Sequence, residues 1–296
     1  MRQFIYKPSD LQLEDWPPGE LRLDNIEVTE DPARADLFVC PGSLAVFNNA
    51  DDLYRLPYFR GNERKHVFFD ISDSPIRYYQ PSIFMRCNLR EGHFNADRNS
   101  IAIPWPAKDY ADLVPLPDGG FQYDVAGHMW ISNQARQVAL FACECHGGLT
   151  YSLRGYDEFH GHVKDPVEVA RREREYRRTM QASRVLLCGE SESGVIPYRF
   201  FETLSAGRVP LLISSGYYLP FQDRIPYDSF ILRCMPDYSG EPARMVYEFV
   251  KGHTDDEIVA MGQLARHYWE RWLDSSKWDS ILAEVVLQRL ELVQCE

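Results

Sequence analysis

The sequence has no long uninterrupted apolar run. Every apolar segment is much shorter than the ~18 residues that a membrane-spanning helix requires. The opening residues, MRQFIYKPSDLQLEDW, also lack the apolar stretch that is typical of a secretory signal. We therefore expect a cytoplasmic protein without a transmembrane segment.

Positive charge is scarce as well. The chain has 32 lysines and arginines against 44 aspartates and glutamates, and its formal net charge is −12. A protein that binds a nucleic-acid backbone needs an extended basic surface, so this balance argues against nucleic acid as a partner. It still allows small anionic ligands, because a local group of arginines can bind them inside an acidic protein.

Paired metal-ligand motifs are missing too. The seven cysteines are odd in number and most lie in apolar runs, which is typical of buried free thiols in a reducing compartment. Cys143-Glu144-Cys145-His146 is the one cluster with metal-ligand chemistry, and no second ligand pair follows at zinc-site spacing. We therefore expect no metal. A metal-dependent hydrolase built around Cys143–His146 is the weaker alternative.

What the sequence does contain is an alternation of short apolar strands with helix-like segments. In the first half, the expected strands cover residues 26–28, 37–40, 66–71, 82–87 and 100–103. In the second half, strands at 185–188 and 209–213 alternate with helices at 165–182, 199–206, 239–252, 255–273 and 276–293. Short continuous apolar strands are typical of parallel sheets covered on both faces. The pattern predicts two α/β units that face each other across a cleft.

A weakly patterned stretch separates the two units. Residues 108–126 contain several prolines and glycines, and we interpret Leu113–His128 as the approach to an inter-domain linker. The first domain then covers residues 1–130 and the second covers 131–275. A last helical segment, 276–296, follows.

The segment Ser183–Asp223 has the most informative pattern: a strand, a Gly/Ser loop, a short helix, a tight turn and a second strand. Small loop residues allow close approach of a phosphate, and a helix start offers free N–H groups. The candidate loop residues are Ser191, Ser193 and Gly194, and Arg199 could contact a phosphate with two hydrogen bonds. The alternative is a polar connection that binds no ligand.

Glu202 lies three residues beyond Arg199, on the same face of the expected helix. A carboxylate near a helix start can accept hydrogen bonds from two ribose hydroxyls. The alternative is an exposed glutamate, or one that pairs with Arg199 within the helix.

These motifs resemble the signature of the exostosin-like glycosyltransferases, family 47. The resemblance is strong over about residues 183–230 and scattered over about 30–145. It is carried by Ser183–Cys188, Arg199-Phe200-Phe201-Glu202, Ala206–Pro210, Leu219-Pro220-Phe221, Ala35–Val39, His66–Phe68 and Ile103–Pro104. Two departures concern the phosphate contacts and the donor sugar. Pro197-Tyr198-Arg199 replaces the family's Ser-Pro-Arg, and Arg208 replaces a frequent cysteine.

The resemblance implies the GT-B fold, with two Rossmann-like domains and a C-terminal helix, 276–296, that crosses back to the first domain. It implies inverting transfer from a nucleotide sugar, UDP-linked, to a hydroxyl of a glycan acceptor. Glu202 would then hold the ribose, and Arg199 and the Ser191–Ser193 loop would lie near the diphosphate. The absence of an Asp-x-Asp motif fits a reaction that requires no metal or other cofactor. The alternative is a non-catalytic nucleotide-sugar or glycan-binding protein of the same fold.

Inverting transfer needs a general base for the acceptor hydroxyl and positive charge for the departing diphosphate. Asp73 and Asp70 follow the strongest strand of the first half, and Asp73 is the preferred base because it lies further out in the loop. The alternative for Asp70 is a turn or cap carboxylate. Arg154 and Arg136 are candidates for stabilising the leaving group, and a surface ion pair is the alternative for each.

Sugar rings often stack on aromatic side chains. Trp105 and Tyr218 are candidates for lining the sugar sites, Tyr218 on the donor side and Trp105 on the acceptor side. His146 is a further acceptor-binding candidate if its segment follows a strand at the cleft. Packing is the alternative for both aromatic residues.

Overall fold

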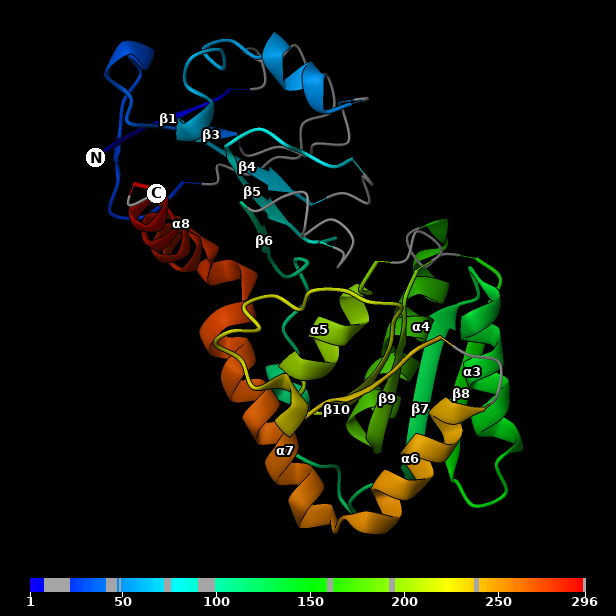
Figure 1. Cartoon of the computed structure of the whole chain (residues 1–296). Helices are drawn as coiled ribbons and strands as arrows, with labels where there is room; N and C mark the ends of the chain where they lie inside the picture. Colours follow the sequence, from blue (N-terminus) through cyan, green and yellow to red (C-terminus); the bar gives the residue numbers. More distant parts are fainter. Residues whose placement is uncertain are drawn as a thin grey trace. The chain divides into compact units, whose positions relative to one another are not determined.

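A computed structural model describes most of the chain, namely residues 1–7, 22–40, 47, 49–71, 76–89, 99–158, 162–191, 195–236 and 240–294. The chain divides into two compact units (Figure 1). Unit 1 comprises Met1–Trp105, Tyr217–Phe221 and Trp272–Glu296. Unit 2 comprises Pro106–Gly216 and Gln222–Arg271.

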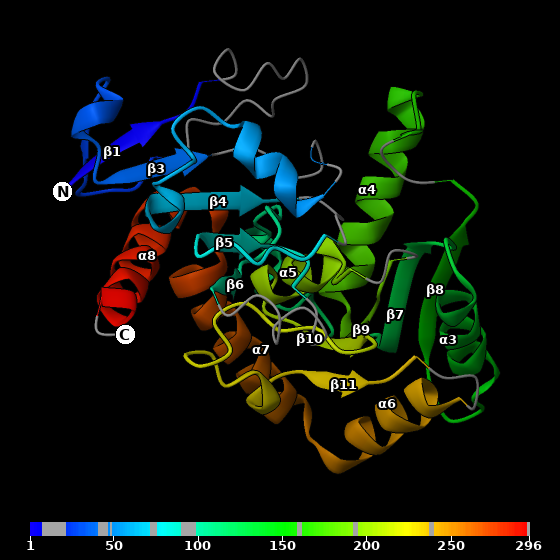
Figure 2. The ribbon, with the colours of Figure 1, turned by 45° about the horizontal axis from the view of Figure 1, so that its top comes forward.

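Unit 1 is built on a parallel sheet, whose strands lie side by side in Figure 2. Within the described residues it has six strands in the order β2-β1-β3-β4-β5-β6. They are β1 (Arg2–Ile5), β2 (Glu27–Val28), β3 (Leu37–Cys40), β4 (His66–Asp70), β5 (Ile83–Arg86) and β6 (Ser100–Ala102). Every residue of β3, β4 and β5 is buried, which explains why these strands are apolar on both faces.

Short 3₁₀ helices connect the strands of unit 1, at Pro32–Arg34, Ala50–Arg55 and Glu63–Lys65. His66 opens β4 inside an aromatic cluster, where its ring stacks on Phe38 at 4.7 Å between centroids. Its ring nitrogens contact the Tyr6 hydroxyl at 2.9 Å and the Asn62 carbonyl at 2.8 Å. Burial lowers the pKa of His66 to about 4, so this histidine is a neutral core residue.

Unit 2 has a second parallel sheet, with the order β11-β10-β9-β7-β8 among the described residues. Its strands are β7 (Tyr123–Trp130), β8 (Tyr151–Tyr156), β9 (Ser183–Gly189), β10 (Val209–Ile213) and β11 (Leu232–Cys234). The two parallel sheets confirm the predicted α/β class with two Rossmann-like units.

Helices cover both faces of the second sheet. They are α3 (Gln134–Cys145), α4 (Pro166–Gln181), α5 (Tyr198–Ser205), α6 (Glu241–Gly252) and α7 (Asp255–Tyr268), with short 3₁₀ turns at Ala111–Leu113 and Tyr227–Ser229. Apolar residues of α3 and α6 pack in one cluster with β7, β9 and β10. Figure 1 shows α5 beside β10 and α7. The opposite face of the sheet is covered by α4 and α5, which both contact β9, whereas Ile258 of α7 belongs to the same cluster as α3 and α6.

The boundary between the units differs from the expected one. Unit 1 ends at Trp105 instead of residue 130, because Tyr123–Trp130 pairs with β8 and β9 as an inner strand of the second sheet. The end of the segment that we interpreted as a linker approach, Leu113–His128, thus belongs to β7. Asp124, Gly127 and His128 interrupt its apolar residues and hide the strand pattern.

The end of the chain returns to unit 1. A π-helical turn, Trp269–Leu273, follows α7, and a 3₁₀ turn, Ser275–Lys277, precedes the last helix, α8 (Trp278–Gln294). The Asp24 amide donates to the Asp279 carbonyl at 3.0 Å, so the start of α8 contacts the segment before β2. None of the helices in the described ranges combines the length and the apolarity needed to cross a membrane.

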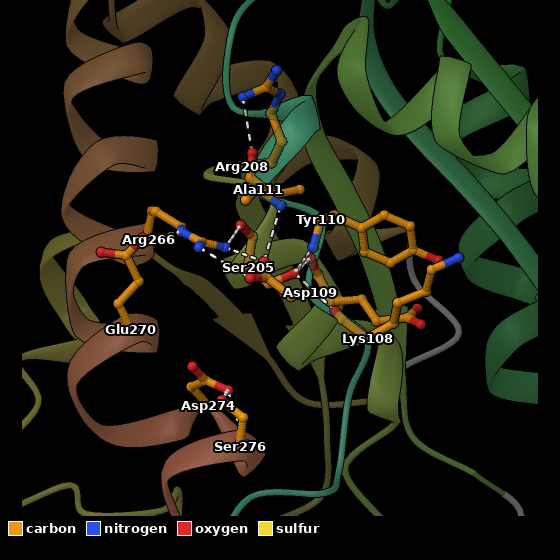
Figure 3. A network of polar contacts seen from close by, with 12 residues as sticks. Lys108, Asp109, Tyr110, Ala111, Ser205, Arg208, Arg266, Glu270, Asp274 and Ser276 are labelled. Atoms are coloured by element: carbon orange, nitrogen blue, oxygen red, sulfur yellow. Dashed lines mark hydrogen bonds and ion pairs between the residues drawn. The ribbon is translucent and has the colours of Figure 1, made fainter.

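The first residues of unit 2 are held by polar contacts with the end of α5 (Figure 3). The Tyr110 amide donates to Ser205 Oγ at 3.1 Å, and Ser205 Oγ donates to the Lys108 carbonyl at 3.1 Å. Arg266 of α7 pairs with Asp109 and donates to the Ser205 carbonyl at 2.6 Å. This segment is therefore anchored to the helix that carries Glu202.

Arg208 explains one departure from the family signature. Its guanidinium is buried and donates to carbonyls that include Leu113 O at 2.6 Å, Gly207 O at 2.9 Å and Gln181 O at 3.1 Å. Burial lowers its pKa to about 10. Arg208 thus joins the turn after α5 to the 3₁₀ turn at Ala111–Leu113 and to the end of α4.

Two glycines allow close packing at the same turn. Gly207 follows the end of α5 with a φ of 63°. A Cβ added to Gly262 of α7 would lie 2.1 Å from the carbonyl oxygen of Gly207. No side chain fits at Gly262 without moving one backbone.

Candidate nucleotide site

The loop after β9 lies at the carboxyl edge of the second sheet, where open parallel sheets bind ligands. Ser191 Oγ accepts from the Val195 amide at 3.1 Å, and the Ser191 amide donates to the Val195 carbonyl at 3.1 Å. Ser193 and Gly194 lie outside the described residues. Glu190, which has the wrong charge for a phosphate contact, accepts from the Ser215 amide at 2.7 Å and turns toward the end of β10.

Arg136 is a structural residue of this edge. Its side chain donates to the carbonyls of Gly189 at 2.9 Å, Glu190 at 2.9 Å and Trp130 at 3.0 Å, and to Ser132 Oγ at 3.1 Å. These contacts join the ends of β7 and β9. The leaving-group role that we expected for Arg136 is not supported, because its donors already bind the protein backbone.

Glu202 is buried on the inner side of α5, with 7% of its surface exposed. Its Oε2 accepts a hydrogen bond of 2.9 Å from the Tyr176 hydroxyl on α4. Burial raises its pKa to about 7, while the charge of Arg199 and the Tyr176 hydrogen bond oppose the rise. Glu202 is therefore neither the exposed glutamate nor the intrahelical partner of the alternative interpretation.

Arg199 lies close to the same pair of residues. Its guanidinium carbon is 5.2 Å from the centroid of the Tyr176 ring. Its Nη1 is buried and has no hydrogen-bond partner among the described residues. A buried cationic donor of this kind is suited to an anionic ligand.

His128 is a residue of this region that sequence reasoning missed. It lies on β7, with 6% of its surface exposed, and its neighbour across the strand pair is Arg154 of β8. Its ring is 6.4 Å from that of Tyr156, and its Nδ1 is buried without a partner in the described part of the chain. Burial, and then the charge of Arg199, lower the pKa of His128 to about 4. A histidine within a buried strand was the signal available in the sequence.

Arg154 has the surface ion pair of our alternative interpretation. It is exposed on the edge strand β8 and pairs with Glu175 of α4, which also accepts from Arg171 at 2.9 Å. The charge of Arg154 nevertheless acts on His128. Arg154 therefore lies at the border of the candidate site.

His146 lies at the other edge of the second sheet. It follows the last residue of α3, a helix that starts after the carboxyl end of β7 and runs back along the sheet. Its ring contacts that of Tyr247 at 4.8 Å. The structure therefore separates His146 from Glu202, contrary to the acceptor-binding role that we expected for it.

Among the described residues, no group of three histidine, cysteine or acidic side chains is placed to hold a metal ion. Burial raises the pKa of the Cys143 thiol to about 12, whereas Cys145 is exposed. The Cys143–His146 motif is thus divided between the core and the surface.

In unit 1, Asp70 is fully buried in an ion pair. Arg86 Nε lies 3.2 Å from its Oδ2, and Arg86 Nη1 donates to the Ile76 carbonyl at 2.8 Å. The two residues are register partners on β4 and β5. A buried, paired carboxylate is poorly suited to take a proton from a substrate, so Asp70 is corrected from candidate base to structural residue. Asp73 lies outside the described residues.

The two aromatic candidates also belong to unit 1. Trp105 is half-buried at the last residue before unit 2, and its indole Nε1 is buried without a partner in the described ranges. Tyr218 is half-buried, and its amide donates to the Leu89 carbonyl at 3.1 Å.

Several solved glycosyltransferase structures are similar to this chain. The enzyme from Rickettsia africae ESF-5 aligns with a TM-score of 0.49 and 8% identity, over 92% of this chain and 86% of that one. Anabaena Alr3699/HepE, in complex with UDP, aligns with a TM-score of 0.46 and 12% identity, over 89% and 86%. TarM aligns with a TM-score of 0.45 and 12% identity over 86% of this chain, which spans 54% of TarM.

Similarity at this level of identity does not establish a shared activity. No protein-family model matches the sequence, and the search of curated proteins found no match. The resemblance to the exostosin-like family thus rests on the motifs quoted above.

Proposed function

We propose that this protein transfers a sugar from a nucleotide sugar, UDP-linked, to a hydroxyl of a glycan acceptor. The observation that carries the proposal is the buried carboxylate of Glu202 at the carboxyl edge of the second sheet, held by Tyr176 and close to Arg199. Ligands of open parallel sheets bind at this edge. Glu202 forms no ion pair with any of the described residues, and a buried acid of this kind is suited to accept hydroxyl donors such as those of a ribose.

The donor contacts follow from this arrangement. Glu202 would accept hydrogen bonds from the two ribose hydroxyls, and these bonds would favour its ionised form. Arg199 would contact the diphosphate together with the Ser191–Ser193 loop and Gly194. Arg154 contributes positive charge at the border, and Tyr218 is proposed to contact the donor sugar.

The reaction that we propose is a single displacement with inversion. The acceptor oxygen forms a bond to the anomeric carbon while the bond from that carbon to the β-phosphate oxygen breaks. A carboxylate takes the acceptor proton, and UDP leaves with its charge balanced by Arg199. Asp73 is the proposed base, Trp105 the proposed acceptor contact, and no metal or other cofactor is proposed.

A donor screen tests this proposal. The full chain is incubated with a panel of nucleotide sugars, with and without glycan acceptors and with a chelator, and nucleotide release is followed. We expect release of UDP that persists with the chelator, and NMR should show inversion of the anomeric configuration in the product. Glu202→Gln should abolish release, and the surface variant Arg244→Gln should not. Absence of release with every donor would contradict the proposal.

One observation favours a second candidate, a non-catalytic nucleotide-sugar or glycan-binding protein. The burial of Asp70 against Arg86 removes one of the two predicted bases. Such a protein would bind UDP through Glu202 and show no turnover. Binding by calorimetry without release of nucleotide from any donor would support it.

A further inference from the structure

Two buried side-chain nitrogens on the α4 and α5 side of the second sheet have no hydrogen-bond partner in the part of the chain that the structure describes. They are Nδ1 of His128 and Nη1 of Arg199, and neither has a partner among the described residues. Buried polar atoms in folded proteins are nearly always paired, so an unpaired one calls for a cause. Two of them on one face of one sheet point to a missing ligand.

The two side chains reach this place from different elements. Side chains alternate along a strand, and the Cβ of Gly127 would meet Leu140 of α3, so its neighbour His128 faces the opposite side, toward α4 and α5. The charge of Arg199 is, after burial, the largest influence on His128, and it lowers its pKa. His128 and Arg199 therefore lie on the same side of the sheet and interact electrostatically.

The acidic residues nearby are already engaged. Glu175 of α4 pairs with Arg154 and Arg171, and Glu202 accepts from Tyr176. Among the described residues, no carboxylate forms an ion pair with the guanidinium of Arg199, although α4 carries several. An oxyanion would provide acceptors for it.

The state of His128 restricts the choice of ligand. With a pKa of about 4, the imidazole is neutral at neutral pH and offers one N–H donor. The neutral imidazole N–H of His128 and the cationic guanidinium of Arg199 together suit a tetrahedral oxyanion, which has several acceptor oxygens. Arg199 also lies in the first turn of α5, one helical turn before the ribose carboxylate, which fits the order of phosphate and ribose in a nucleotide.

We propose that His128 and Arg199 together bind a phosphate group of the nucleotide donor. His128 donates one hydrogen bond to a phosphate oxygen, and Arg199 donates to the same group through Nη1. The inference rests on the proposed function, and it adds a phosphate ligand from β7 to the loop and helix start identified from the sequence.

Calorimetric titration with UDP and with uridine tests it, because the two ligands differ only in the diphosphate. His128→Leu should weaken UDP binding about tenfold or more and leave uridine binding unchanged, since it removes a hydrogen bond to a charged group. His128→Asn places an amide near Nδ1 and should retain UDP affinity within about threefold. Arg199→Gln should weaken UDP binding at least as much as His128→Leu does. Arg244→Gln on α6 is the matched control for the loss of one positive charge.

Thermal unfolding of the ligand-free variants separates a binding role from a structural one. The Nδ1 atom of His128 has no partner among the described residues, so His128→Leu should melt no lower than the wild type. A lower melting temperature with an unchanged ratio of UDP to uridine affinity would overturn the inference.

Inorganic pyrophosphate separates this inference from the proposed function. If pyrophosphate binds and both His128→Leu and Arg199→Gln weaken it, the phosphate site stands even where UDP fails to bind. If UDP binds and neither variant changes its advantage over uridine, the proposed function stands and the phosphate site is wrong. If neither UDP nor pyrophosphate binds to the wild type, both are wrong.

Discussion

The Tyr176 hydroxyl on α4 donates a 2.9 Å hydrogen bond to Oε2 of Glu202 on α5. Burial raises the pKa of Tyr176 well above its ordinary value, so the phenol keeps its proton and acts as a donor. The bond links the two helices that cover one face of the second sheet and orients the carboxylate on which the proposed function rests.

Removal of this donor should weaken nucleotide binding in a pH-dependent way. In Tyr176→Phe, the pKa of Glu202 should rise further above 7, since the hydrogen bond that favours the carboxylate is gone. We expect UDP affinity to fall about five- to tenfold at pH 7 and much less at pH 8.5. Calorimetry at both pH values measures this, with the exposed Tyr151→Phe as control. An equal loss of UDP affinity at both pH values would show that Tyr176 acts on binding without changing the ionisation of Glu202.

Glu202 should also make stability depend on pH. Its pKa is raised from 4.5 to about 7, so between these values the folded state holds a proton that the unfolded chain has released. The free energy of unfolding from this residue therefore falls by about 3 kcal/mol as pH rises through that window. Denaturant unfolding of the wild type and Glu202→Gln across this range measures the difference.

The buried histidines act in the opposite direction. The pKa values of His66 and His128 are lowered from 6.5 to about 4, so their contribution to stability is lost as pH falls across that window. Both effects are present in Glu202→Gln as in the wild type, and they cancel when the two curves are subtracted. A flat difference curve would contradict the raised pKa of Glu202.

Asp70 and Arg86 should be a stability pair. Asp70→Asn leaves a buried guanidinium without its ion-pair partner and should lower the free energy of unfolding by about 3–5 kcal/mol. The double variant Asp70→Leu/Arg86→Met should recover part of that loss, because it removes both charges. Urea unfolding measures all three proteins. A stable Asp70→Asn protein that binds UDP without turnover would instead make Asp70 the base.

Unlike Asp70, Asp73 should affect sugar transfer and leave stability unchanged. Asp73→Asn is expected to retain UDP affinity and thermal stability while transfer falls by two to four orders of magnitude, roughly the contribution of a general base. Single-turnover assays with a saturating donor check this, and Asp51→Asn serves as a control for an exposed aspartate of unit 1. Unchanged transfer in the Asp73 variant would mean that another residue takes the proton.

Arg208 should be difficult to replace. In Arg208→Lys, one ammonium cannot reach the several carbonyls that the guanidinium contacts, and we expect a loss of about 3 kcal/mol in unfolding free energy. Hydrogen exchange should also accelerate near Val114. Arg208→Cys, which introduces the cysteine typical of the resembled family, removes all of these hydrogen bonds. If that variant unfolds with the same free energy as the wild type, the contacts do not stabilise the fold.

The fold was predictable where strands are apolar on both faces. The segments now seen as β4, β9 and β10 have this pattern, because parallel strands are covered by helices on each side. β7 and β8 escaped prediction for physical reasons. β7 contains polar residues, among them the buried His128, that break its apolar pattern. β8 is an edge strand with several exposed residues.

The site was predictable only where its residues are close in sequence. Arg199 and Glu202 share one helix, so their spacing was visible. Tyr176 and His128 come from other elements, and only the folded sheet brings them to α5. Arg136, in the first turn of α3, and Asp70, at the end of β4, were harder to assign, because a charged residue near a ligand-binding edge can equally bind backbone carbonyls or a neighbouring strand.

The contact between Gly207 and Gly262 has a consequence for the helix that carries Glu202. With no side chain between the two backbones, α7 approaches the turn after α5 more closely than any side chain at Gly262 would allow. A larger residue at Gly262 would therefore displace α7 or the turn after α5, and the position of the Glu202 carboxylate would depend on which of the two moves.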